Sequence, residues 1–354
     1  MKNITNLPNP NITTYNPHPQ IQDYFKILSP EFPSWLYDYI NTKEMLHQQY
    51  VSVTCGTIYS DLFESDFFYS NLDHSVGVAL VVWHFTHDKK QTLSGLFHDI
   101  ATPAFKHCVD FMNGDYMTQE STEDLTTQII QNSPEITALL ARDKIKISEI
   151  DDYHKYPIAD NDTPCLSADR LEYSLSNALL TYKLLDLEGI KTIYRDIKIG
   201  QGIDGAPELE FKTKKIARQF IKTTSILSVI YREDRTRYSM QFFADILKKL
   251  NQANLIQTSD LYHLKETEII DIINQTDYAS ALNNWSNAKK VKTAKTAPKD
   301  AYYIKQPTKV RYIDPLCNGA RMSTSCQLAK KMINKNLSYD MNSYVYLDNI
   351  SINP

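Results

Sequence analysis

The chain has 354 residues, of which 42% are hydrophobic and 23% charged, a composition typical of a folded protein with one large or two medium domains. Its 38 basic and 42 acidic residues give a net charge of −4, which argues against nucleic acid as a partner held by bulk charge. Only nine glycines are present, and neither G-x-x-x-x-G-K-[ST] nor G-x-G-x-x-G occurs, so glycine-rich phosphate loops and doubly wound α/β folds are not expected.

Cysteine usage and apolar runs bear on the compartment. The five cysteines are odd in number and widely spaced, without a C-x-x-C pair, which favours a reducing compartment over a disulfide framework. The first six residues lack the apolar run of a signal peptide, and the longest apolar run, 76–83, is too short to span a bilayer. We therefore expect a cytoplasmic protein that does not interact with membranes.

Residues 1–50 predict an N-terminal arm followed by a leading helix. Asparagine and proline are frequent up to about residue 30, which is typical of extended chain. Trp35, Leu36, Tyr39 and Ile40 then recur at helical spacing.

Residues 51–188 predict a helical domain. A helix from 70 to about 87 is apolar nearly all round, which indicates a buried core helix. The pair Ser133-Pro134 places an N-cap before a proline at the first helical position. Further helices are predicted over 90–100, 105–112, 122–132, 133–142 and 166–187.

Residues 189–354 predict an accessory region that mixes helices with a few short strands. Strand-like runs at 190–199 and 209–212 flank a glycine-rich turn, which favours a hairpin. Amphipathic helices are expected over 214–231, 238–251 and 267–274, and a lysine-rich linker over 287–299. Further strands are expected at 302–304, 310–313 and 344–347. The fold class is thus mainly α, with the few strands in the C-terminal region.

Histidine and aspartate residues gather at the predicted helix ends. His98 and Asp99 are adjacent at the end of an apolar run, His74 lies in the first turn of the helix before them, and Asp169 opens the 166–187 helix. Two imidazoles and two carboxylates suit one divalent transition ion, Mn, Fe, Co, Ni or Zn, better than Mg or Ca. We therefore predict that His74, His98, Asp99 and Asp169 are metal ligands.

The order His, His-Asp, Asp resembles the HD superfamily of metal-dependent phosphohydrolases, and it is most similar to the deoxynucleotide triphosphohydrolase branch. The pattern H-D-x-x-H-x-P-F-x-H of that branch aligns without a gap at His98, Asp99, Phe105 and His107. Its A-D-x-x-x-Y segment is similar to Ala168-Asp169-Arg170-Leu171-Glu172-Tyr173. The resemblance covers about residues 70–180 and implies an HD-domain helical core that holds the metal site.

Two positions depart from the pattern of that branch. Thr102 stands where the family has a histidine after the His-Asp pair, and Thr122 stands where it has the histidine before Glu123. Threonine can hydrogen-bond a phosphate, but it cannot act as a general acid near neutral pH. His107, Asp110 and Glu123 remain as the predicted catalytic groups.

Four residues are predicted to bind substrate. Thr102 and Lys106 follow the His-Asp pair, Arg170 follows Asp169, and Tyr173 lies one turn after Asp169 on the same helix face. In the family the matching tyrosine lies near the nucleotide sugar. The alternative for Lys106 and Arg170 is an ordinary surface charge, and for Tyr173 a core position.

The resemblance implies a phosphohydrolase that cleaves a phosphate ester or anhydride of a nucleotide, such as a dNTP or an NMP, with metal-activated water. It also implies a homo-oligomer. The alternative, motivated by Thr102 and Thr122, is a catalytically impaired nucleotide-binding regulatory protein of the same fold. A di-iron oxygenase of this fold needs additional histidines, for which only His107 and His154 are candidates.

Overall fold

The computed structural model describes residues 2–119, 121, 125–202 and 204–352. Within them the chain is mainly helical, with a few short strands, as the sequence predicts. The helices of the N-terminal half are α1 (Pro19–Leu28), α2 (Leu36–Ile40), α3 (Lys43–His47), α4 (Asn71–Thr86), α5 (Lys89–Phe97), α6 (His107–Met112), α7 (Thr126–Asn132), α8 (Pro134–Asp143) and α9 (Ala168–Ser176). Those of the C-terminal half are α10 (Leu187–Arg195), α11 (Lys214–Ile230), α12 (Asp234–Gln252), α13 (Glu266–Asn274), α14 (Ala279–Ser286), α15 (Met322–Ser325) and α16 (Gln327–Leu337).

The strands form two small sheets. In the first, β1 (Ile197–Gln201) pairs antiparallel with β2 (Pro207–Phe211), and β2 pairs parallel with β5 (Leu316–Cys317), which pairs with β6 (Ala320–Arg321). In the second, β7 (Tyr344–Tyr346) lies between β3 (Lys292–Ala294) and β4 (Tyr303–Ile304). The predicted hairpin around the glycine-rich turn is therefore confirmed.

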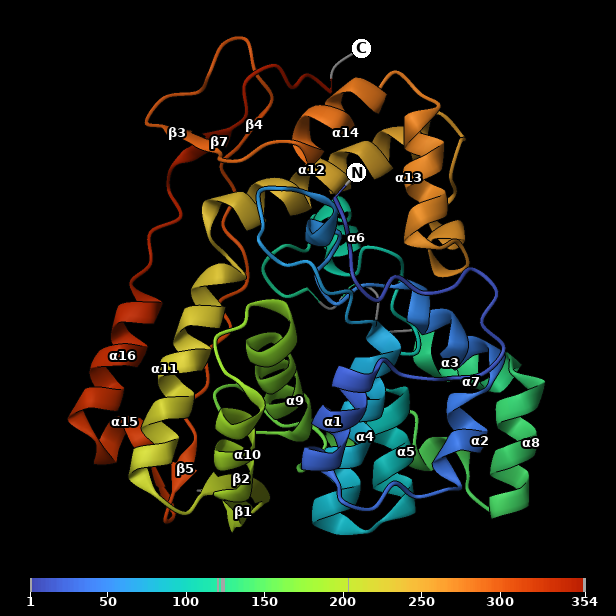
Figure 1. The fold of residues 1–354 in the computed structure, drawn as a ribbon, viewed down its shortest axis with the longest axis vertical. Coiled ribbons are helices and arrows are strands. Elements are labelled where there is room, and N and C mark those ends of the chain that lie inside the picture. The colour runs from blue at the N-terminus through green and yellow to red at the C-terminus, as the bar shows by residue number, and fades with distance from the viewer. Residues whose placement is uncertain (1, 120, 122–124, 203, 353–354) are drawn as a thin grey trace.

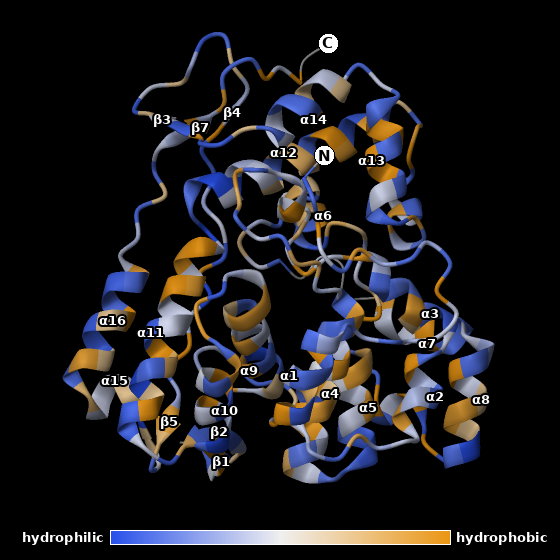
Figure 2. Ribbon diagram, in the orientation of Figure 1, coloured by the Kyte–Doolittle hydropathy of each residue, from blue (hydrophilic) through white to orange (hydrophobic). Residues whose placement is uncertain are grey.

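Two apolar cores organise the molecule, and each uses segments that are far apart in the sequence. The first core lies among α1, α4, α5, α8, α9, α10 and α11, in the lower part of Figure 1. The second core lies among α6, α12, α13, α14, β4 and β7, in the upper part. Most of these helices carry both hydrophilic and hydrophobic residues, because only one face of each is buried (Figure 2).

Helix α4 is the central element of the first core. All residues from Asn71 to Val82 are buried, as the all-round apolar pattern predicts. The helix begins with a capping box, in which Ser70 Oγ accepts a hydrogen bond from Asp73 N and Asp73 accepts one from Ser70 N. Tyr15 Oη also donates to Asp73 Oδ1 at 2.7 Å, so this cap fixes the N-terminal arm and places His74 in the first turn.

Several predicted elements differ in the structure. The helix predicted over 166–187 ends sooner, because a π-helical turn at Asn177–Thr181 follows α9. Residues 187–195 are helical rather than extended, since α10 has its apolar residues on a helical period. The predicted strand at 310–313 is wrong, because this segment joins no ladder. The lysine-rich segment 287–299 is not only a linker, since it contains β3.

We expect Ser70→Ala to lower the free energy of unfolding by about 1 kcal/mol, because the first turn of α4 loses its cap. It should also weaken metal binding, since His74 lies in that turn. The matched control is Ser133→Ala, which removes the N-cap of α8 and should lower stability alone. Denaturant unfolding and metal titration measure both effects. Unchanged metal affinity in Ser70→Ala would show that the cap does not position His74.

Candidate metal centre

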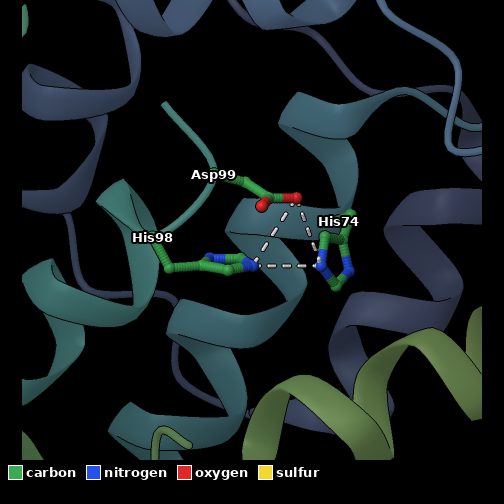
Figure 3. A group of neighbouring side chains, drawn as sticks. All are labelled: His74, His98 and Asp99. Carbon is green, nitrogen blue, oxygen red and sulfur yellow. Dashed lines mark hydrogen bonds and ion pairs between the residues drawn. The ribbon is translucent and has the colours of Figure 1, made fainter. Parts of the chain in front are cut away.

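Four predicted ligands converge from three elements. His74 comes from the first turn of α4, His98 and Asp99 directly follow α5, and Asp169 lies in the first turn of α9. The Nε2 atoms of His74 and His98 are 3.2 Å apart. Asp99 Oδ2 lies 3.9 Å from His74 Nε2 and 3.7 Å from His98 Nε2 (Figure 3). Asp169 Oδ1 lies 3.1 Å from His74 Nε2 and 3.7 Å from His98 Nε2.

The outer nitrogen of each imidazole is held by a hydrogen-bond acceptor. His98 Nδ1 donates to the carbonyl oxygen of Gly95 at 2.8 Å, and His74 Nδ1 lies 2.5 Å from Glu172 Oε2. These partners place a proton on each Nδ1, so in the neutral rings both Nε2 lone pairs point into the cluster. Metal-binding histidines typically donate their other ring N–H to an acceptor of this kind.

Glu172 contacts the candidate metal cluster and was not among the residues predicted for the site. Its side chain is completely buried, and its other oxygen accepts a hydrogen bond from Tyr69 Oη at 2.6 Å. A Cβ atom at Gly77 would lie 2.7 Å from Glu172 Oε1, so the glycine on α4 provides the space for this carboxylate. The spacing in the sequence could have indicated Glu172, because it lies three residues after Asp169 and is therefore near it on the surface of α9.

The charges in the cluster shift the pKa values of its members. Burial lowers the pKa of His74, but Glu172 and Asp169 outweigh burial and raise it to about 10. Burial raises the pKa of Asp169, but the bond from His74 outweighs it and holds the pKa at about 2. The pKa of Asp99 also lies below its usual range, because the ammonium of Lys106 and the two histidines outweigh its burial. Without a metal, the cluster therefore carries a proton on His74.

Three of the four predicted ligands are grouped closely enough that they could hold one ion. The ligand atoms of His74, His98 and Asp99 lie within 4.8 Å of one another. Ligands about 2.1 Å from one ion lie about 3.0 to 3.4 Å apart, and the nitrogen and carboxylate contacts of 3.1 to 3.9 Å are close to this spacing. Two lone pairs and two carboxylates facing one point would repel one another unless a cation or a proton lay between them.

The cluster borders a cavity of about 450 Å³, a volume typical of small-molecule sites. Both cores contribute to its wall, and the side chains of Asp99 and Asp169 are 25% and 21% exposed. Among the predicted substrate-binding and catalytic residues, the structure places five at this cavity: Thr102, Lys106, His107, Arg170 and Tyr173. The lining also includes residues that the sequence interpretation did not assign to it: Lys309, Arg311, Tyr182 and Tyr231.

His107 and Asp110 form a pair beside the metal cluster. His107 Nδ1 lies 2.9 Å from Asp110 Oδ2, and Asp110 Oδ1 accepts hydrogen bonds from the amide and hydroxyl of Ser121. Arg311 Nη2 donates to His107 Nε2 at 3.1 Å and to Gln119 Oε1 at 2.6 Å. Burial and Arg311 lower the pKa of His107, against an opposing effect of Asp110. His107 is therefore a neutral imidazole whose Nε2 lone pair points towards Arg311.

Arg170 and Lys106 are not surface charges, since their side chains are only 12% and 11% exposed. Arg170 Nη1 donates to Asp160 Oδ1 at 2.7 Å and also to Asn161, so the guanidinium holds the loop before α9. Lys106 Nζ donates to Asp99 Oδ2 at 2.7 Å. Tyr173 is packed edge-on against Tyr231.

The remaining predictions concern Thr122, Glu123, His154, membrane-spanning helices and the cysteines. Thr122 and Glu123 lie outside the described residues. His154 lines the cavity with one ring nitrogen 3.2 Å from Asp152, so it is not a further member of the metal cluster. None of the helices in the described part of the chain is both long and apolar enough to cross a membrane. All five cysteines are free.

No family model matches the chain. The fold is similar to that of a phosphohydrolase from Bacteroides thetaiotaomicron VPI-5482, with a TM-score of 0.60 and 12% identity over 89% of this chain and 96% of the other. It is also similar to a hypothetical protein from Aquifex aeolicus, with a TM-score of 0.52 and 14% identity over 90% and 93% of the two chains. At such identities these likenesses concern the fold alone.

One sequence relative is an uncharacterized protein of Bacillus subtilis (strain 168), YdhJ. It is 24% identical over 209 residues, which are 57% of this chain. The match spans 60% of that protein's length.

We expect Glu172→Gln to weaken metal binding by about 10- to 100-fold, because a neutral amide no longer fixes the proton and orientation of His74. The glutamine keeps the shape of the side chain, so the fold should persist. Tyr69→Phe is the matched control, since it removes only the bond to the other oxygen of Glu172. Titration with Mn²⁺ measures the affinity, and an unchanged value in Glu172→Gln would contradict the role given to this carboxylate.

Metal binding should release about one proton per ion at pH 7, because His74 is protonated without metal and must present a bare Nε2 to bind. The apparent affinity should therefore rise with pH until about pH 10. Since the pKa of His74 is raised on folding, its proton stabilises the metal-free fold fully below about pH 6.5, and this contribution is lost as the pH rises towards 10. Calorimetry in buffers of different ionisation enthalpy counts the protons. Zero release would contradict this protonation state, and His84→Gln, outside the cluster, should leave the count unchanged.

Proposed function

We propose that this protein is a metal-dependent phosphohydrolase that cleaves a phosphate ester or anhydride of a nucleotide. The observation that carries the proposal is the convergence of His74, His98, Asp99 and Asp169 at the wall of a cavity that also has cationic side chains. The similarity in fold to a protein named a phosphohydrolase supports the same reaction class.

The four ligands would hold one divalent ion of Mn, Fe, Co, Ni or Zn, the metals that accept mixed nitrogen and oxygen ligands. When bound, such an ion lowers the pKa of a coordinated water molecule and polarises a phosphoryl oxygen. The chain's own contribution is the fixed direction of both Nε2 lone pairs, which Glu172 and Gly95 provide. Because these partners are buried, the ligands need little rearrangement when an ion arrives.

The remaining cavity residues suit an anionic, partly aromatic substrate. Lys106, Arg170 and Arg311 supply positive charge that would bind phosphate oxygens, and guanidinium groups do so in a bidentate manner. Tyr173 and Tyr231 form an aromatic wall that would hold the sugar and base of a nucleotide. Thr102 would donate a hydrogen bond to the phosphate from its place beside the ligands.

His107 and Asp110 are the proposed proton-transfer pair. Asp110 is fixed by Ser121 and holds the Nδ1 proton of His107, which leaves Nε2 able to accept a proton. In the described structure, the guanidinium of Arg311 donates a hydrogen bond to that nitrogen. A phosphate group that drew Arg311 to itself would therefore free His107 for catalysis. Glu123, the third predicted catalytic residue, stays a prediction.

One specific observation favours the alternative of a catalytically impaired regulatory protein that binds a nucleotide. Thr102 cannot transfer a proton near neutral pH, while His107 and Arg170 are both engaged in bonds with protein groups. Nucleotide binding without turnover would follow if Arg311 did not leave His107. The assignment to the deoxynucleotide triphosphohydrolase branch, the homo-oligomer and the cytoplasmic location stay predictions.

The test combines metal analysis of the purified protein with a screen of dNTPs, NMPs and other small phosphate esters in the presence of Mn, Co, Ni or Zn. We expect about one ion per chain and turnover of at least one nucleotide. Asp169→Asn should lose the ion and reduce turnover by at least about 100-fold, because the ion supplies several kcal/mol of stabilisation to the transition state. Asp23→Asn, which makes the same charge change at an exposed position of α1, is the control.

Two other results decide against the proposal. Absence of both metal and turnover with every ion would contradict it. Thermal stabilisation by a nucleotide, together with bound metal but without product, would favour the regulatory alternative.

A further inference from the structure

Lys106 is a cation of the cavity that bonds a proposed metal ligand directly. Its Nζ donates to Asp99 Oδ2 at 2.7 Å and to Asn71 Oδ1 at 2.5 Å. This is the same oxygen of Asp99 that lies within 3.9 Å of both histidine Nε2 atoms. The ammonium and a divalent ion would therefore share one ligand atom.

The backbone holds Lys106 in this place at a conformational cost. Phe105 and Lys106 have φ values of +63° and +46°, a region that side-chain-bearing residues rarely adopt. Neighbours in the second core fix the turn, since Glu266 accepts a hydrogen bond from Phe105 N and the Phe105 ring stacks on Phe243. A Cβ atom at Gly56 would lie 2.7 Å from the Phe105 ring. Strain that the surrounding packing enforces in this way is commonly found at functional positions.

The partner of Lys106 on α4 is fixed as well. The amide nitrogen of Asn71 donates to Gln48 Oε1 at 2.8 Å and to the carbonyl oxygen of Asp99 at 3.1 Å. The amide oxygen of Asn71 consequently points at the ammonium. Lys106 thus lies in a prepared position on the metal ligand, while its side chain also lines the cavity.

We propose that Lys106 is a positioning residue that competes with the metal ion for Asp99 and transfers to a substrate phosphate once the ion is bound. Two cations on one carboxylate oxygen repel each other, so the arriving ion weakens the hold of Asp99 on the ammonium. The flexible side chain then turns into the cavity, where a phosphate group is its nearest new partner. Metal loading would in this way prepare the cationic phosphate site, so that metal binds before substrate. This inference rests on the proposed function and adds an order of binding to it.

The first test measures Mn²⁺ binding to metal-free protein. Lys106→Met keeps the length of the side chain and removes the competing charge, so it should bind Mn²⁺ about tenfold more tightly than the wild type. Lys90→Met makes the same charge change at an ion pair with Glu149 and should leave the affinity unchanged. A merely structural role for Lys106 would weaken metal binding on substitution. An unchanged or weaker affinity in Lys106→Met would therefore overturn the proposal.

The second test uses inorganic phosphate as the probe. Without metal, wild type and Lys106→Met should bind phosphate equally weakly, because Asp99 holds the ammonium. With Mn²⁺ bound, the wild type should bind phosphate about tenfold more tightly than Lys106→Met. A difference already present without metal, or none with metal, would overturn the transfer of Lys106.

Failure of the underlying function has a separate signature. If Asp99→Asn and Asp169→Asn both bind Mn²⁺ as the wild type does, the metal site itself is wrong. If these two variants lose the metal and Lys106→Met binds Mn²⁺ with the affinity of the wild type, the proposed metal site is supported and only the competition between Lys106 and the ion is contradicted.

Discussion

The bond between His74 and Glu172 is the interaction on which the candidate site depends. It joins α4 to α9 at a point where Gly77 leaves room for a carboxylate and where Tyr69 holds the second oxygen. An unpaired carboxylate buried so completely would be costly, so the glutamate, the histidine and the tyrosine require one another. The same bond aims the other nitrogen of His74 at the cluster. The same contact therefore determines both the packing of α4 against α9 and the orientation of the His74 ring.

The charges around the cavity follow from this constraint. The cavity is lined by the carboxylates of Asp99 and Asp169 and by three cationic side chains, Lys106, Arg170 and Arg311. Each cation is engaged with a protein acceptor, Asp99 for Lys106 and Asp160 for Arg170. The positive charges of Lys106 and Arg170 are thus paired with protein carboxylates, and the proposed phosphate substrate would have to exchange these bonds for its own. Such an exchange ties ligand binding to small rearrangements of the cavity wall.

The four proposed ligands could be selected from the sequence because each belongs to a local pattern. His74 follows the Ser70–Asp73 cap, His98 and Asp99 end an apolar run, and Asp169 opens a helix, so local signals locate all four. Glu172 was not predicted as a site residue, because no sequence pattern distinguishes a buried acidic residue on an amphipathic helix from an exposed one. Arg311 was not predicted as a site residue. It lies far along the chain from His107, in a segment that belongs to no strand, and no periodicity in the sequence indicates such a contact. The prediction of one helix through residue 187 was wrong. A π-helical turn follows α9, and such a turn leaves the apolar pattern of the sequence nearly unchanged.

The segment that carries Arg311 belongs to the C-terminal half of the chain, although it lines the cavity beside the proposed ligands of the N-terminal half. Lys309, Arg311 and Tyr312 line the cavity, Lys309 N bonds to the carbonyl oxygen of Tyr116, and Asp314 N bonds to the carbonyl oxygen of Pro164. A piece of the chain that stopped at residue 188 would retain every metal ligand and the His107–Asp110 pair. It would lack the guanidinium that covers His107 and the tyrosine that faces Tyr173. Such a piece would therefore carry the four proposed ligands without the part of the cavity lining that Arg311 and Tyr231 provide.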